Sequence, residues 1–139
     1  MSENKIDVIV SSGPPHSLHR IALKIHKHTK IPWLADFRDP WTGIDFYSQL
    51  MLTSIADKIH HKMEKEVLTT STKVVTVSDN CAKDMKKLCN REIDIITNGY
   101  DEQDFINDKN IKPEVFRLSH IGAINKDRNP DVFWGSLAE

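Results

Sequence analysis

The chain has 139 residues, of which 39% are hydrophobic and 28% are charged. This length allows one domain with a core that removes roughly two-thirds of the unfolded surface from water. Nineteen basic residues against 20 acidic ones, a formal net charge of -1, argue against a basic nucleic-acid-binding protein and a highly charged disordered tail. The two cysteines, the short apolar runs and the polar first residues predict a soluble cytoplasmic protein without a transmembrane segment.

Short β-rich runs alternate with amphipathic helical stretches along the sequence. Strands are predicted over 7–11, 32–36, 73–77, 93–96 and 116–121. Apolar residues recur at helical spacing in three stretches between these runs: Leu18, Ile21, Ala22 and Ile25; Leu52, Ile55, Ala56, Ile59 and Met63; and Cys81, Ala82, Met85, Leu88 and Cys89. Ser78 or Asp79 is placed to cap the third helix, and a last helix is expected after Pro130.

This alternation predicts an α/β fold with a partial Rossmann-like parallel sheet and flanking helices. Right-handed crossovers are expected to place helices on both faces of the sheet. The polar stretch 104–113 has no periodicity and is typical of a linker, which suggests domains over 1–114 and 115–139. Ligands of such sheets bind beyond the carboxyl ends of the strands, which here are followed by 11–17, 36–41, 78–80, 98–101 and 122–128.

The first of these segments, Gly13 to Ser17, connects a strand to a helix. Free backbone N–H groups at a helix start attract anions, but Pro14 and Pro15 remove two of these donors. The segment is therefore no Gly-rich phosphate cradle. It is either a rigid turn that exposes His16 or a loop that contacts a ligand.

The densest polar cluster follows the second strand. Asp36 and Asp39 flank Arg38, and Trp41 comes soon after. One interpretation is a structural ion-pair cluster. The other is a pocket for a hydroxyl-rich ligand, in which the guanidinium of Arg38 holds an anionic group and a carboxylate acts as a base or positions the ligand.

The histidines and cysteines give little support to a metal or redox site. The pairs His16/His19, His26/His28 and His60/His61 lack the i, i+4 spacing of a helical zinc pair, so no metal site is predicted. His26, His28, His60 and His61 are expected to cover solvated helix faces. Cys81 and Cys89 lie two turns apart on one helix and are expected to pack against the core.

Several motifs, taken together and in order, resemble the GT4-type retaining glycosyltransferases. The runs 7–17 and 31–41 are similar to two successive strand-and-loop segments of that family, and 74–78 is similar to its next strand. Residues 96–101 resemble its Asn-Gly-hydrophobic-Asp turn, and 120–122 with 128–130 resemble the opening of its donor-binding domain. The resemblance is colinear over nearly the whole chain.

The resemblance implies the GT-B fold, in which two Rossmann-like domains enclose a cleft. Residues 1–114 would be the second half of the acceptor-side domain and 115–139 the start of the donor-binding domain. The parent enzyme would transfer a sugar from a nucleotide-sugar to a glycan or lipid-linked acceptor with retention, as in polysaccharide biosynthesis, at or near the inner face of the membrane. This fragment would be inactive alone. The alternative is a non-catalytic α/β ligand-binding or interaction module.

The resemblance also implies roles for single residues. Asp36, Arg38 and Asp39 would orient the acceptor for catalysis, with His16, Ser17, Asn98 and Asp101 on the acceptor-side loops. Gly122 and Arg128 would contact the donor diphosphate, whereas Ala123 stands where many relatives have an arginine. Neither a metal nor another cofactor is implied.

The resemblance places the first strand in the middle of the family's sheet. Here its inner neighbour is missing, so Val8, Ile9 and Val10 are expected to form an exposed edge strand. We expect the chain to self-associate along this edge, most simply as a two-fold dimer.

Overall fold

The structure is a computed structural model that describes residues 5–104, 114–122, 124 and 129–137. The chain forms two compact units, Met1–Gly99 and Tyr100–Glu139. The domain boundary expected near residue 115 stays a prediction.

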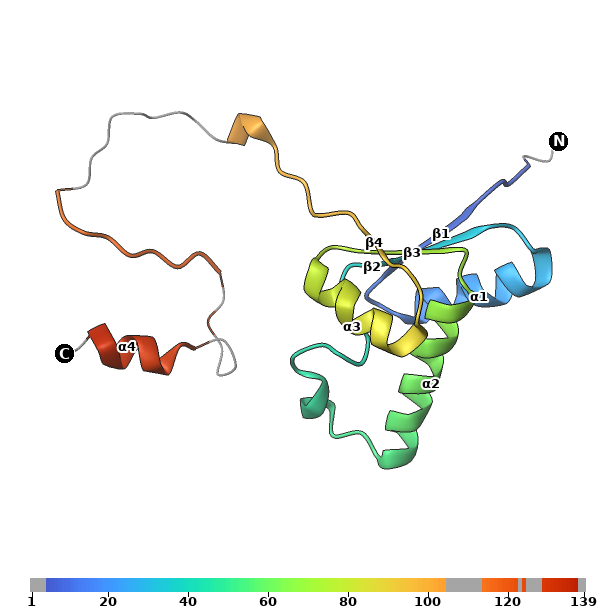
Figure 1. The fold of residues 1–139 in the computed structure, drawn as a ribbon, viewed down its shortest axis with the longest axis horizontal. Coiled ribbons are helices and arrows are strands. Elements are labelled where there is room, and N and C mark those ends of the chain that lie inside the picture. The colour runs from blue at the N-terminus through green and yellow to red at the C-terminus, as the bar shows by residue number, and fades with distance from the viewer. Residues whose placement is uncertain (1–4, 105–113, 123, 125–128, 138–139) are drawn as a thin grey trace. The chain divides into compact units, whose positions relative to one another are not determined.

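The first unit is an α/β structure, as the alternating pattern predicts. Its elements in chain order are β1 (Ile9–Gly13), α1 (Ser17–Thr29), β2 (Trp33–Phe37), a short 3-10 helix η1 (Tyr47–Leu50), α2 (Ser54–Thr70), β3 (Lys73–Thr76), α3 (Asp79–Cys89) and β4 (Asp94–Ile95). The four strands form one parallel sheet in the order β1-β2-β3-β4 (Figure 1).

The three long helices of this unit lie on one face of the sheet (Figure 1). The expectation of helices on both faces is therefore wrong for the described residues. The strand order explains this. Crossovers between parallel strands are ordinarily right-handed, and here each one moves in the same direction across the sheet, so each helix arrives on the same side. In a doubly wound sheet, which has helices on both faces, the strand order reverses its direction across the sheet partway along the chain.

Strand β2 shows the difference between the two faces. Trp33, Ala35 and Phe37 alternate along it and are completely buried against the helices, whereas Leu34 and Asp36 point to the opposite, open face. The helices contribute Leu23, Leu68 and Met85, among others, to the same core.

Helix α1 buries only Ala22 of the apolar stripe that the sequence pattern indicates. Leu18, Ile21 and Ile25 are 43%, 56% and 45% exposed, and the buried residues are His19, Ala22 and Leu23. The helix is thus rotated by about one residue relative to the prediction. The imidazole of His19 takes the place next to the sheet that an apolar residue was expected to fill.

Helix α2 differs from the prediction in the same way, and α3 does not. The α2 residues Ile55 and Ile59 are exposed, and the buried residues are Glu64, Val67 and Leu68. Of the predicted stripe, Met63 packs against the core. In α3 the predicted stripe is confirmed, with Ala82 and Met85 buried and Cys81, Leu88 and Cys89 packed against the core. Ser78 caps α3, because its hydroxyl accepts a hydrogen bond from the Cys81 N–H.

The second unit contains η2 (Glu102–Asp104) and α4 (Asp131–Leu137). The helix expected after Pro130 is confirmed. The strand predicted over 116–121 is wrong, since these residues are all described and are irregular. A lone β-rich run has no ladder to join, and no strand is found among the described residues of this unit. Within the described ranges, no helix combines the length and the apolar character needed to cross a membrane.

Candidate functional site

A polar pocket lies at the carboxyl ends of β1 and β2. It has a volume of about 400 Å³ and is lined by Ser12, Pro14, Arg38, Asp39 and Asn98. We call it the strand-end pocket. Its position agrees with the rule that parallel sheets bind ligands where their strands end.

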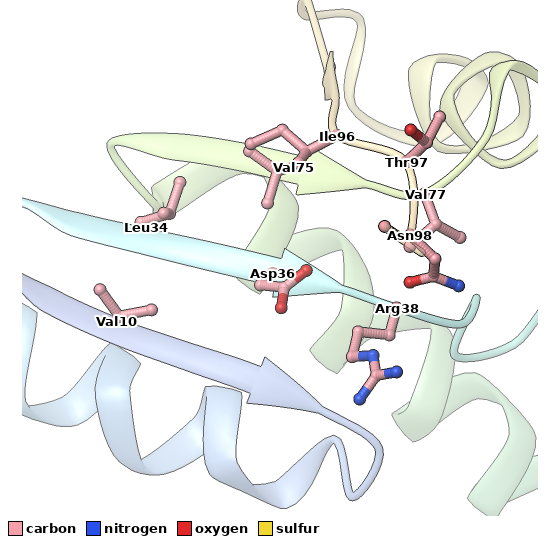
Figure 2. A pocket seen from close by; sticks show the side chains of 10 residues that line it. Val10, Leu34, Asp36, Arg38, Val75, Val77, Ile96, Thr97 and Asn98 are labelled. Atoms are coloured by element: carbon pink, nitrogen blue, oxygen red, sulfur yellow. The ribbon is translucent and has the colours of Figure 1, made fainter. Parts of the chain in front are cut away.

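A second hollow of about 330 Å³ adjoins the strand-end pocket and runs over the open face of the sheet. We call it the open-face groove (Figure 2). Its apolar lining consists of Val10, Leu34, Val75, Val77 and Ile96, and its polar lining includes Asp36 and Thr97. Arg38 and Asn98 line both hollows, so the groove and the pocket share one wall.

Asp36 is held by its neighbour on β1. Ser12 and Asp36 are partners in the β1–β2 register, and the Ser12 hydroxyl donates a 2.7 Å hydrogen bond to Asp36 Oδ2. This bond fixes the carboxylate on the open face of the sheet, where Figure 2 shows it between Val10 and Arg38. A carboxylate accepts several hydrogen bonds, so Asp36 can still accept one from a ligand hydroxyl.

Arg38 is tied to β1 through its backbone, and its side chain has no ion-pair partner among the residues that the structure describes. Its N–H donates to the Gly13 carbonyl at 3.1 Å and thereby continues the β1–β2 ladder by one bond. The residue is exposed, and its guanidinium forms no ion pair with the described carboxylates, those of Asp36 and Asp39 included. The ion-pair interpretation of this cluster is therefore not supported among the described residues.

The loop before α1 is held by aromatic contacts. His16 stacks on Trp41, with ring centroids 5.2 Å apart and an interplanar angle of 10°, and it also stacks on Phe37. Burial lowers the pKa of His16, against smaller opposing effects from Glu64, the Pro40 backbone and Asp39. His16 is thus a half-buried neutral ring rather than an exposed histidine, and Ser17 is the exposed first residue of α1.

A buried polar chain lies beneath this loop. The Trp33 indole N–H donates to Ser11 Oγ at 2.8 Å, and Ser11 Oγ lies 2.8 Å from His19 Nδ1. Since the serine oxygen accepts from the indole, its hydroxyl hydrogen is available for Nδ1 of a neutral His19. Burial, with a smaller contribution from the nearby His16 ring, lowers the pKa of His19 to about 4, against an opposing effect from Asp36.

Gly13 is needed where these rings converge. A Cβ atom at position 13 would lie 2.8 Å from His19 Nε2 and 2.9 Å from His16 Nδ1. Both distances are shorter than a van der Waals contact, so a side chain would displace one of the two rings.

Glu64 on α2 fixes the loop that follows β2. It is 1% exposed, and its carboxylate accepts hydrogen bonds from the N–H groups of Trp41 and Thr42 at 3.2 Å and from the Thr42 hydroxyl. The sequence pattern does not predict that Glu64 and His19 are buried. Each is a polar residue in an amphipathic helix, and the pattern alone places it on the solvated side. Nothing in the run 36–41 indicates that a carboxylate on α2 accepts hydrogen bonds from this loop.

The structure brings together only some of the predicted site residues. Asp36, Arg38, Asp39 and Asn98 line the adjoining hollows. Asp101 and Gly122 belong to the second unit. The Asp101 carboxylate accepts the Gln103 N–H at the start of η2, and Gly122 has a φ of 139° that favours glycine. Arg128 and Ala123 lie outside the described residues.

The described residues form no metal site, and the chain matches no known protein in the comparisons below. The described part of the chain contains no group of three or more histidine, cysteine, aspartate or glutamate residues arranged to hold a metal ion. Comparison of the chain with protein-family models, with curated proteins and with solved structures finds no match.

Proposed function

We propose that this chain forms the acceptor-side wall of a retaining glycosyltransferase of the GT4 type, where it binds a hydroxyl-rich acceptor. The observation that supports this most is the strand-end pocket, which is lined by Asp39, Asn98 and Arg38, whose guanidinium has no ion-pair partner among the described residues. Sugars present hydroxyl groups that both donate and accept hydrogen bonds. A pocket with a cation, a carboxylate and an amide can satisfy both kinds.

The residues that line the strand-end pocket and the adjoining groove have distinct parts in this proposal. Asp36, held by Ser12, and the exposed Asp39 accept hydrogen bonds from acceptor hydroxyls, and Arg38 donates to them. These contacts orient the attacking oxygen, and orientation is a large part of the rate enhancement in a two-substrate reaction. His16 and Trp41 support the loops on either side through their stacked rings.

The donor side is the less complete part of the proposal. Departure of a nucleoside diphosphate requires cations and amides that stabilise its developing charge. Only Gly122 and Arg128 correspond to such groups by resemblance. We therefore expect no sugar transfer by this chain alone, and binding of the acceptor is the property to test.

Calorimetry with a panel of mono- and disaccharides tests the proposal. The chain should bind at least one sugar, and Arg38→Ala should weaken that binding at least tenfold, equal to roughly 1.4 kcal/mol. The free energy of unfolding should not change, because the Arg38 side chain is exposed. Lys62→Ala, an exposed cation on α2, is the matched control and should bind as the wild type does. Lack of binding to every sugar, or an equal effect of both variants, would contradict the proposal.

The second candidate is a non-catalytic α/β ligand-binding or interaction module. The open face of the sheet favours it, since parallel sheets are ordinarily covered on both faces, and here Val10 and Ile96 are 61% and 63% exposed. Binding of a ligand without sugar character at the strand-end pocket would favour this candidate over the first.

We also propose that β1 pairs with a second copy of the chain. In the described residues β1 bonds only to β2. The Ile9 N–H and the Gly13 carbonyl take part in the ladder to β2, so the alternate residues Val10 and Ser12 direct their N–H and C=O groups to the free edge. Antiparallel pairing of two such edges around a two-fold axis would satisfy these groups in both copies.

A further inference from the structure

Two loops that carry walls of the strand-end pocket are joined by a stacked pair of rings. Pro14 lines the pocket from the loop before α1, and Asp39 lines it from the loop after β2. His16 of the first loop stacks on Trp41 of the second, with ring centroids 5.2 Å apart and an interplanar angle of 10°. The stack thus holds the two walls at their present spacing.

The two partners of the stack differ in how firmly they are held. The Trp41 backbone N–H donates to the buried Glu64 carboxylate at 3.2 Å, and its indole N–H donates to Nδ1 of His60 at 3.3 Å. His16 is the N-cap residue of α1, but its side chain makes no capping hydrogen bond. Its Nδ1 atom is buried and has no hydrogen-bond partner among the described residues. His16 is therefore the half of the stack that can leave.

A second buried ring nitrogen faces the same space. Nε2 of His19 is also without a hydrogen-bond partner among the described residues. This atom and Nδ1 of His16 lie 2.8 Å and 2.9 Å from the position that a Cβ atom would take at Gly13. Because the Ser11 hydroxyl hydrogen is available for Nδ1 of His19, the hydrogen of this neutral ring is on Nε2. One N–H group therefore already points into this space.

We infer that protonation of His16 breaks its stack on Trp41 and opens the strand-end pocket. An imidazolium carries hydrogens on both ring nitrogens, so the charged ring brings a second N–H group to the space that the His19 N–H occupies. Two buried donors that face each other without an acceptor are unfavourable, and the charged ring escapes this by turning into water. Pro14 then moves with its loop, and the pocket loses that wall.

The charged groups that face His16 come from α2 and from the loop after β2. Burial lowers the pKa of His16 below its ordinary 6.5. The carboxylates of Glu64 on α2 and of Asp39 in the loop, with the Pro40 backbone, oppose this shift more weakly. The stack is therefore intact at neutral pH and opens on acidification.

His19 stays neutral while His16 gains its proton. It is completely buried, whereas His16 is half-buried. Its pKa is about 4, because burial and the His16 ring outweigh the opposing effect of Asp36. The Nε2 hydrogen of His19 is thus in place when His16 becomes charged.

An NMR pH titration of the chain tests the inference without any ligand. The ring resonances of His16 give its titration curve, and the cross-relaxation (NOE) between the His16 and Trp41 rings should be lost along the same curve. The backbone amide resonances of Arg38 and Asp39 should shift with the same midpoint, because the other wall of the pocket has moved. The amide resonances of α3 should stay in place, which separates opening of the loop from unfolding.

Two substitutions of His16 imitate the two states. His16→Phe keeps a ring for the stack and brings no N–H group, so the ring contact with Trp41 should persist at every pH at which the chain is folded. His16→Gln removes the ring, so the amide resonances of Arg38 and Asp39 should take their acid positions already at neutral pH. His28→Phe makes the same change at an exposed histidine of α1 and should respond to pH as the wild type does.

The outcomes decide the inference independently of the proposed function, because no sugar is used. A stack that persists after His16 has gained its proton overturns it, and so does a loss of the stack that follows the titration of His60 or His19 instead. If His16→Phe does not fold, the wild type and His16→Gln still decide. Failure of every sugar to bind would contradict the proposed function and leave this inference standing.

Discussion

Ser12 and Asp36 lie directly opposite each other in the parallel pairing of β1 and β2, and the Ser12 hydroxyl donates a 2.7 Å hydrogen bond to the Asp36 carboxylate. The bond joins a residue that lines the strand-end pocket, Ser12, to one that lines the open-face groove, Asp36. It also gives the carboxylate one orientation before any ligand binds, which reduces the ordering that binding requires.

Ser12→Ala should therefore affect both stability and binding. Loss of a part-buried hydrogen bond to a carboxylate should lower the free energy of unfolding by about 1 kcal/mol, and sugar affinity should fall several-fold because Asp36 is no longer oriented. Urea unfolding and calorimetry measure the two effects. Ser54→Ala, at an exposed position that begins α2, should change neither. A Ser12→Ala protein with wild-type affinity would show that Asp36 does not contact the ligand.

His19 predicts how stability depends on pH. Its pKa is about 4 in the folded chain and 6.5 in the unfolded chain, so the unfolded state binds more protons between these values. Stability is complete above pH 6.5 and falls as the pH drops toward 4. Between pH 7 and pH 5 the free energy of unfolding should decrease by about 2 kcal/mol.

Urea unfolding at a series of pH values, with wild type and His19→Asn, measures this dependence. The variant should have a flatter profile over pH 5–7, and the part that remains should reflect His16, whose pKa is also lowered. The pKa of Glu66 is held at about 2 by its hydrogen bonds to Lys27 and Arg20, so that group affects stability only at lower pH. Identical slopes in the two proteins would contradict the assignment to His19.

Gly13→Ala should destabilise the chain by about 1–3 kcal/mol, because its Cβ would be closer than contact distance to the half-buried ring of His16 and the buried ring of His19. Gly99→Ala provides the control, since no atom lies within 4 Å of a Cβ at that position, and its stability should change by less than about 0.5 kcal/mol. Guanidinium unfolding compares the two. Equal effects would mean that the two histidines do not pack as described.

Val10→Pro tests the proposed pairing of β1 edges. The Val10 N–H faces the free edge, so proline removes a donor for a second copy without removing a bond to β2. The variant should keep its unfolding midpoint and should dissociate in sedimentation experiments at concentrations where the wild type self-associates. Ile9→Pro removes the N–H that donates to Pro32 and should destabilise the fold instead. A monomeric wild type at high concentration would refute the pairing.

Much of the first unit follows from local sequence patterns. The β-branched run at Val74 and Val75, the Ser78 cap and the apolar stripe of α3 each specify their own element, and strand–helix alternation then leads to a parallel sheet. Chain direction alone puts the polar residues Asp36 and Arg38 at the carboxyl end of β2. Their place at the strand ends can therefore be predicted without any tertiary contact.

The remaining features depend on which elements become neighbours. Strand order decides that the helices share one face, and a local pattern does not contain strand order. Glu64 and His19 are buried because backbone N–H groups of another loop and the Ser11 hydroxyl satisfy them, whereas hydrophobic periodicity counts them as solvated. The run 116–121 has strand-like residues without a strand to pair with among the described residues of its unit.

The central claim is that the strand-end pocket binds a sugar acceptor, and an NMR titration of the ¹⁵N-labelled chain tests it most directly. Addition of a sugar that binds in calorimetry should shift the backbone amide resonances of Ser12, Arg38, Asp39 and Asn98 in a saturable way. In Arg38→Ala the sugar concentration needed for half of the full shift should be at least tenfold higher. Saturable shifts confined to residues away from these strand ends, or shifts that Arg38→Ala leaves unchanged, would contradict the claim.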